Sequence, residues 1–387
     1  MNTDNQPLQL LSEAFYRRKI GQIQVRMDAE QLDGMLLLDV PNVIYACGFF
    51  HTPSERPLGL YIPKSGEVAL FVPLLELENA GASWIKDIRT YFEYPGETHP
   101  VEWMVKEAGV KRLGIDTLTV DVYQMLGGNV TVTPMIEQMR WIKEPEEIAF
   151  VEKAATYADY CLEYILEHAG AIIRDGGTEL DILKACIGAT SAKMKAEVGE
   201  IFKLGGSSVV GTVHSGPRAA LPHGSPIERK PQIGEPMIAG IGASVGGYHA
   251  ESGATFVIGE PKGDVMRCLE AAMECDLAGI RALRVGNSCT QVNDAALNVL
   301  REYGLGDAIR HRIGHGMGLQ GHEGPWLAPG DNTPLMAGMV FSNEPGIYRP
   351  NIDGYRLIDS MIVTDGEAKI PSRFLANHPP EKRIIPL

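Results

Sequence analysis

The sequence has too few basic residues to balance its acidic ones. Its 387 residues include 35 Lys and Arg against 49 Asp and Glu, which gives a formal net charge of −14 at pH 7. Nucleic acids and acidic membrane faces attract proteins with cationic surfaces. The charge balance therefore predicts no nucleic-acid partner and no membrane partner, and it leaves a small-molecule substrate as the expected ligand.

Long hydrophobic runs and paired cysteines are also absent. The longest apolar runs, such as Gly34–Leu38 and Val68–Leu75, are far shorter than the ~18–20 residues that span a bilayer. The first residues lack the apolar core of a secretory signal. The six cysteines form no CxxC pair, and in a chain without a signal this favours reduced thiols. These features predict a soluble, cytoplasmic protein.

The chain is long enough for two domains, and its pattern changes near residue 136. Before that point a helix is predicted at Leu11–Leu32, and short apolar runs alternate with helical segments, which is typical of an α/β sheet. The predicted strands are Gly34–Leu38, Leu58–Pro63, Glu67–Pro73, Ile88–Phe92 and Arg112–Ile115. We expect a small N-terminal α/β domain over residues 1–135 and a catalytic domain over residues 136–387.

The second domain begins with a strong helix signal. Glu144-Pro145-Glu146-Glu147 places a proline and acidic residues in a first turn, and apolar residues then recur at helical spacing through Ile173. Further helices are predicted at Asp264–Leu283 and Cys289–Tyr303. Gly-rich, strand-like segments fill much of the remainder, so the fold class expected for the whole chain is α+β.

The candidate chemistry lies in Gly-rich segments of this second domain. Five histidines, His223, His249, His311, His315 and His322, have glycines close to them in the sequence. Glycine lets the backbone and a ligand approach closely, and such loops often carry function. Together with the segment Ser342-Asn-Glu-Pro-Gly346, these histidines indicate an active site rather than scattered structural residues.

The same segments carry a family resemblance. The second domain resembles the pita-bread family that includes methionine aminopeptidase, aminopeptidase P, prolidase and creatinase, and the N-terminal domain resembles the smaller domain of the creatinase and prolidase branch. The motifs, in the family's order, are Met139-Arg-Trp-Ile-Lys143, Ala220–Gly224, Gly246-Gly-Tyr-His249, Gly314-His-Gly-Met-Gly-Leu319 with His322-Glu-Gly-Pro325, and Met339–Gly346. The resemblance implies a pita-bread catalytic domain.

The family's metallopeptidases hold two metal ions with five side chains, and this sequence keeps only part of that set. The resemblance places Glu251, His315 and Glu344 at three ligand positions, whereas Gly240 and Ile358 occupy the other two. A two-metal centre needs more carboxylates than remain. We therefore expect no metal cofactor; the alternative is one divalent ion held by Glu251, His315 and Glu344.

Creatinase works without metal, and several positions resemble it. The resemblance implies that His223 shuttles a proton, that Glu344 binds substrate, and that Arg56 reaches across a homodimer to hold a substrate carboxylate. Arginine suits that task because its planar fork binds a carboxylate through two hydrogen bonds. The second substrate-binding glutamate of creatinase falls on Gly253 here. Glu251 lies two residues earlier, on the same face of a predicted strand, and is the carboxylate expected to replace it.

The expected function is a metal-independent, creatinase-like hydrolase that cleaves an amide or amidine C–N bond of a small nitrogen-containing carboxylate. His223 would serve as acid and base, with Glu251 and Glu344 as further catalytic groups. His315, His322 and Tyr248 are the remaining predicted substrate-binding residues. Three alternatives stay open: a metal-dependent Xaa-Pro aminopeptidase or dipeptidase, a lyase similar to dimethylsulfoniopropionate lyase, and a non-catalytic binding protein.

Overall fold

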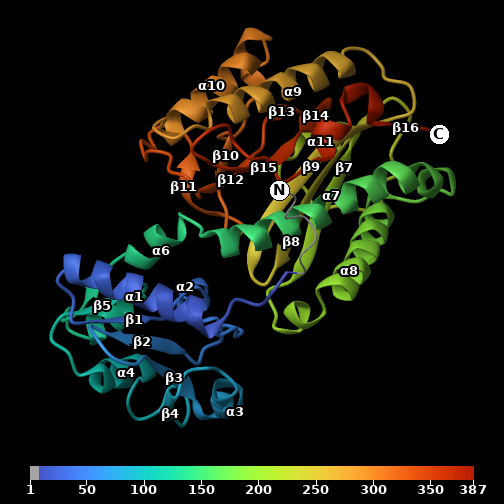
Figure 1. Cartoon of the computed structure of the whole chain (residues 1–387). Helices are drawn as coiled ribbons and strands as arrows, with labels where there is room; N and C mark the ends of the chain where they lie inside the picture. Colours follow the sequence, from blue (N-terminus) through green and yellow to red (C-terminus); the bar gives the residue numbers. More distant parts are fainter. Residues whose placement is uncertain (1–7) are drawn as a thin grey trace. The chain divides into compact units, whose positions relative to one another are not determined.

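The structure, a computed structural model, describes residues 8–387. These residues form two units, one of Gln9–Arg140 and one of Trp141–Leu387 together with Leu8, and Figure 1 shows the elements of each. The boundary expected at 135/136 stays a prediction. No helix in the described range has the length and apolar character needed to cross a membrane.

The N-terminal domain is built on a six-stranded mixed sheet with the order β4-β3-β2-β1-β5-β6. Its apolar strand residues are mostly buried, and they form the core. The strands predicted from alternating apolar runs are confirmed to within two residues at either end. The strands are β1 (Gly34–Leu37), β2 (Gly59–Pro63), β3 (Ala69–Pro73), β4 (Asp87–Tyr91), β5 (Leu113–Ile115) and β6 (Thr131–Val132). The helices are α1 (Glu13–Ala29), α2 (Val40–Cys47), α3 (Leu77–Gly81), α4 (Pro100–Ala108), α5 (Val120–Met125) and α6 (Met135–Arg140).

Helix α2 is an element that the sequence does not reveal. Asp39, Pro41 and Asn42 suggest a turn that closes the first strand, but Pro41 lies in the first turn of a helix. A proline is well accommodated there because its fixed φ suits the helix and its missing N–H has no helical partner to lose. The helix ends at Gly48, which has a φ of 72° that favours glycine.

The catalytic domain contains a sheet with the order β11-β10-β12-β15-β9-β8-β7, and β16 pairs with β9. A separate two-stranded sheet is formed by β13 and β14. The strands are β7 (Ser208–Ser215), β8 (Pro236–Val245), β9 (Tyr248–Ile258), β10 (Gly314–Gly316), β11 (Glu323–Leu327), β12 (Val340–Asn343), β13 (Gly346–Arg349), β14 (Asp353–Arg356), β15 (Ile358–Ile362) and β16 (Ile384–Ile385).

Five α-helices accompany this sheet. Helix α7 runs along β8 and β9, α8 packs on β7, and α9 packs on α10 and on the strands β12–β15 (Figure 1). The three helices predicted from periodicity are confirmed as α7, α9 and α10. The helices are α7 (Pro145–Arg174), α8 (Glu179–Lys203), α9 (Val265–Ala282), α10 (Cys289–Glu302) and α11 (Phe374–Asn377). All six cysteines are free and buried.

Candidate active site

Glu251 is positioned by the long hairpin of β8 and β9. Gly246 and Gly247 form its two-residue turn and have positive φ values of 55° and 86°, which glycine adopts without strain. On β9, the backbone N–H of Glu251 donates to Ser360 Oγ at 2.8 Å, and Ser342 Oγ donates to Glu251 Oε2 at 2.8 Å. Ser360 on the adjacent strand β15 thus fixes the backbone of Glu251, and Ser342 on β12 holds its carboxylate.

His315 is the buried centre of the site. It lies on the short strand β10, between Gly314 and Gly316; a Cβ at Gly316 would lie 2.6 Å from the carbonyl oxygen of Gly324, so the close strand packing requires glycine there. The Nδ1 atom of His315 lies 3.1 Å from the carbonyl oxygen of Gly316. An N–H at Nδ1 would donate to that carbonyl and would leave a lone pair on Nε2.

The Nε2 atom of His315 points at two carboxylates and has no hydrogen-bond partner among the described residues. It lies 3.4 Å from Glu344 Oε1 and 3.7 Å from Glu251 Oε2. Burial lowers the pKa of His315 and favours the neutral ring. A buried neutral nitrogen aimed at two acidic side chains has the chemistry of a metal ligand.

His322 completes a group of ligand atoms. Its ring lies 3.8 Å from that of His315, centroid to centroid, and the ligand atoms of Glu251, His315 and His322 all lie within 4.8 Å of one another. The sequence predicts Glu344 as the third ligand of a single ion, whereas the structure clusters His322 with the other two. Glu344 follows β12 directly and stays within reach of His315.

Among these ligand residues, the carboxyl group of Glu251 has a markedly raised pKa. Burial, and next the nearby charge of Glu344, raise the pKa of Glu251 to about 7. Two carboxylates held close together with little water disfavour ionisation unless a cation lies between them. Two imidazoles and a carboxylate with a fourth position open is a ligand set that suits a divalent ion such as Zn²⁺. The described residues therefore fit one metal ion.

The further ligand positions implied by the resemblance hold no carboxylate in the structure. Gly240 on β8 and Ile358 on β15 both lie opposite Gly253 of β9. A Cβ on Gly240 would lie 2.5 Å from Arg356 Nη2, and a Cβ on Gly253 would lie 2.6 Å from Ile358 Cγ1. The Arg356 guanidinium and the Ile358 side chain thus fill the space beside these two glycines.

A cavity of about 330 Å³ opens beside the Glu251–His315–His322 group. Two predicted catalytic residues, His223 and Glu344, and the predicted substrate-binding residue His322 line it. The lining residues are Pro222, His223, Arg310, His311, Arg312, His322, Glu344 and Arg356. The three arginines were not among the predicted site residues. Arg310 and Arg312 flank His311 just before the Gly-rich run, but nothing in that pattern distinguishes them from surface arginines.

The other predicted substrate-binding residues lie elsewhere. Tyr248 is buried, and its hydroxyl donates to Glu147 Oε1 of α7 at 2.8 Å, so it does not line the cavity. Arg56 belongs to the N-terminal domain, where its Nε donates to Glu93 Oε1 at 2.6 Å and its Nη2 donates to Glu93 Oε2 at 3.1 Å. Its predicted role at a shared active site stays a prediction.

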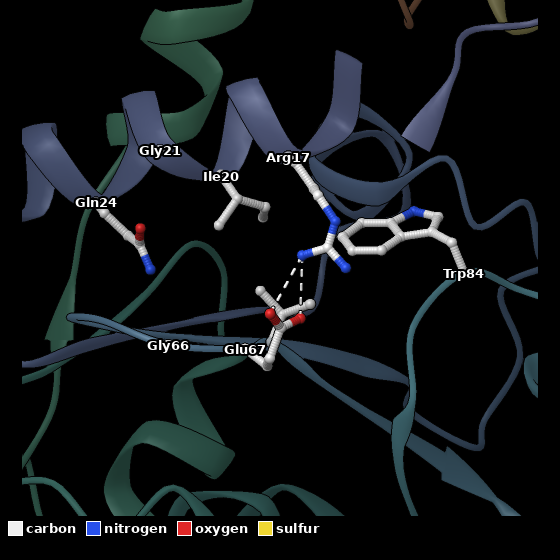
Figure 2. Close-up of a pocket in the computed structure, with 8 residues that line it drawn as sticks. Arg17, Ile20, Gly21, Gln24, Gly66, Glu67 and Trp84 are labelled. Atoms are coloured by element: carbon white, nitrogen blue, oxygen red, sulfur yellow. Dashed lines mark hydrogen bonds and ion pairs between the residues drawn. The ribbon is translucent and has the colours of Figure 1, made fainter. Parts of the chain in front are cut away.

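A second hollow, of about 160 Å³, lies in the N-terminal domain between α1 and the segment Gly66–Val68. Figure 2 shows the Arg17 side chain beside the Trp84 ring, with dashed lines to Glu67. The Arg17 guanidinium carbon lies 4.9 Å from the Trp84 ring centre, and the guanidinium pairs with Glu13 and Glu67. Because two carboxylates already pair with this arginine, it offers no uncompensated positive charge to an anionic ligand.

Comparison with known proteins identifies both domains. The profile of metallopeptidase family M24 matches residues 149–365, and that of the creatinase/prolidase N-terminal domain matches residues 19–142. An uncharacterised peptidase of Staphylococcus aureus strain USA300 is 30% identical over 90% of this chain and 96% of its own length. A Xaa-Pro dipeptidase of Pyrococcus horikoshii is also 30% identical, over 91% of this chain and 95% of its own length.

Solved structures of dipeptidases and prolidases have the same fold as this chain. Dipeptidase PepE from Mycobacterium ulcerans superposes with a TM-score of 0.84 at 28% identity, covering 98% of this chain and 100% of that one. The prolidase from Pyrococcus horikoshii OT3 superposes with a TM-score of 0.78 at 26% identity, covering 92% and 98%. The expectation of an α+β chain with an N-terminal domain of the creatinase and prolidase type and a pita-bread catalytic domain is confirmed.

The leading functional expectation, however, is wrong. Relatives with a named activity include a Xaa-Pro dipeptidase and a prolidase, and the family is one of metallopeptidases; this overturns a metal-independent, creatinase-like hydrolase and favours the metal-dependent alternative. The physical reason for the error is that Gly240 and Ile358 remove two ligands of a two-metal centre but do not prevent the binding of one ion, because the structure still gathers one set of three ligand atoms. The chain belongs to metallopeptidase family M24 and is a hydrolase that acts on C–N bonds.

Proposed function

We propose that this protein is a dipeptidase of the Xaa-Pro type that works with one divalent metal ion. The observation that carries the proposal is the unpartnered, buried Nε2 of His315, which faces Glu251 and Glu344 and clusters with His322. Glu251, His315 and His322 would hold the ion, with Glu344 beside them. A bound ion would supply Lewis-acid polarisation of the scissile carbonyl.

The remaining chemistry is assigned to side chains that line the cavity. An amide nitrogen must be protonated as it leaves, and His223, which is exposed on the cavity wall, is the group we propose as its proton donor. Glu344 is the carboxylate in the lining that can accept a proton from the attacking water. A cavity of about 330 Å³ lies at the small end of ligand pockets, which supports a dipeptide rather than a longer peptide.

The test compares metal-stripped protein with protein reconstituted with Zn²⁺, Mn²⁺ or Co²⁺, using Ala-Pro as substrate and Ala-Pro-Ala to detect aminopeptidase activity. We expect hydrolysis of the dipeptide that disappears with chelator and returns with one ion. His315→Ala and Glu251→Gln should lose both activity and bound metal. The matched control is His168→Ala on α7, whose ring stacks on Tyr164. Full activity after metal removal, or no peptide hydrolysis with any ion, would refute the proposal.

We further propose that the protein works as a cytoplasmic homodimer whose partner subunit contributes Arg56 to the substrate carboxylate. Six free, buried thiols support a reducing compartment, and symmetric dimers are the commonest oligomers of soluble proteins. Analytical ultracentrifugation gives the oligomeric state. Mixing inactive Arg56→Ala and His223→Ala chains, after verified subunit exchange, should restore part of the activity; a mixture without activity contradicts the shared site.

A further inference from the structure

The cavity wall carries an unusual excess of positive charge for so acidic a chain. Of its eight lining residues in the described part of the chain, three are arginines and one, Glu344, is a carboxylate. The negative charge of Glu344 balances one of the three guanidinium charges, so the lining residues have a net charge of about +2. A wall of this kind attracts an anionic ligand.

None of the three arginines forms an ion pair with a carboxylate among residues 8–387; each is held by neutral groups instead. Arg356 Nη1 donates to the carbonyl oxygen of Pro222 at 2.9 Å, and Arg312 Nε donates to that of Gly314 at 3.0 Å. Arg310 Nη1 donates to the carbonyl oxygen of Ile309 at 3.0 Å. Such bonds fix the direction of a guanidinium without placing a carboxylate directly against it.

Other arginines in this domain are neutralised. Arg349 pairs with Asp264 and Asp353, and Arg229 pairs with Glu235. The difference matters because a charged side chain without a partner is costly to remove from water. Arginines that line a cavity without carboxylate partners are thus typical of a site whose anion arrives with the ligand.

Arg356 is the most constrained of the three. Its residue is only 8% exposed, and its Nε is buried without a hydrogen-bond partner. Its backbone N–H donates to Thr255 Oγ1 at 2.9 Å, and its carbonyl oxygen accepts from the same hydroxyl at 3.0 Å. The missing side chain of Gly240 leaves room for its guanidinium. A group fixed in this way loses little freedom when it binds a ligand.

We propose that Arg356 and Arg312 recognise two separate carboxylates, so that the preferred substrate is an acidic dipeptide, one with an Asp or Glu side chain in addition to its terminal carboxylate. This inference rests on the proposed function for the bond that is cleaved. A single terminal carboxylate satisfies one guanidinium fork and leaves the other unpaired in a filled cavity, which is unfavourable. Arg310, at the exposed rim, adds charge that attracts the same class of ligand.

The experiment measures binding rather than turnover, so that it is independent of the metal. Isothermal titration calorimetry on chelator-treated protein compares Glu-Pro with Gln-Pro, and Asp-Pro with Asn-Pro, since each pair ends in the proline of the proposed substrate class and differs in charge but hardly in shape. In at least one pair we expect the acid to bind about tenfold or more tightly than the amide in low salt, with a smaller ratio in 0.5 M NaCl.

Arg356→Met and Arg312→Met should each remove most of that preference, and Arg356→Lys should restore part of it. Arg281→Met, an exposed arginine on α9, is the matched control and should keep the preference. If Arg356→Met fails to fold, as judged by circular dichroism, Arg312→Met alone decides. Equal affinity for acid and amide in both pairs overturns the inference, while metal-dependent cleavage of Ala-Pro would still leave the proposed function intact.

Discussion

The number of metal ions per chain is the sharpest consequence of the site geometry, and we predict one. The described residues gather one set of ligand atoms, from Glu251, His315 and His322. Beside it, Arg356 Nη2 lies 2.5 Å from where a Cβ of Gly240 would be. A guanidinium there repels a second cation as well as occupying its space.

The thermodynamic effect of one ion can be estimated. An ion that binds only the folded protein stabilises it by ~2.7 kcal/mol when its free concentration is about 100 times Kd. For a domain of about 250 residues each kcal/mol shifts Tm by roughly 2–4 °C. Zn²⁺ should therefore raise Tm of chelator-treated protein by roughly 5–10 °C, and His315→Ala or His322→Ala should abolish most of the shift.

The assay combines differential scanning calorimetry with metal analysis by mass spectrometry. Wild-type protein should reach one equivalent of Zn²⁺. Gly240→Asp with Ile358→Glu should stay near one, because the Arg356 guanidinium remains next to position 240 and its charge repels a second cation, and adding Arg356→Ala to that pair should bring the content to two. Two tightly bound ions in the wild-type protein would refute the reasoning, as would a wild-type Tm that is insensitive to Zn²⁺.

Three further predictions concern single side chains. His223→Ala should lower kcat by ~10²–10⁴ at unchanged Tm, because the residue is exposed on the cavity wall; a variant that loses activity only by unfolding would show a structural role. Lys143→Met should cost ~3–5 kcal/mol in urea unfolding, because it leaves the buried carboxylate of Glu323 without the Nζ that lies 2.8 Å away; adding Glu323→Gln should recover much of this, and additive losses would contradict the pairing. Burial raises the pKa of both Asp276 and Asp359, and their mutual proximity raises that of Asp359 further. The folded state thus keeps a proton that the unfolded chain releases above about pH 4, so Tm should fall as pH rises from about 4 to 7; Asp359→Asn should flatten this slope, and an unchanged slope would contradict the assignment.

Sequence patterns predicted helices and strands well wherever a short segment carries a clear local signal, such as an apolar run or a helix start. The strand β1 and the helix α7 follow directly from an apolar run and from an acidic first turn with proline. Helix α2 was missed because a proline near a strand end indicates a turn as readily as a helix start. The difference depends on whether the next turn packs on the core, which is a tertiary property.

The site was predicted in part for the same reason. His223, Glu251, His315, His322 and Glu344 stand out because they lie in motifs, and the structure brings them to one region. A motif does not state which side chains lack partners, however. The three cavity arginines look in the sequence like any surface arginine, and their significance appears only when the nearby carboxylates have been located.

The lack of carboxylates at positions 240 and 358 affects the charge of the site as well as the number of ions that it can bind. Gly240, Gly253 and Ile358 lie on three adjacent strands and face one another across β8, β9 and β15. Replacing carboxylates here with glycine and isoleucine removes negative charge, and the space that Gly240 leaves open accommodates a permanently charged guanidinium from the end of β14. An arginine cannot release a proton or dissociate as a metal ion does. The positive charge beside the Glu251–His315–His322 group is therefore permanent, and we predict that the same residues both limit this group to one ion and favour a substrate that carries its own negative charge.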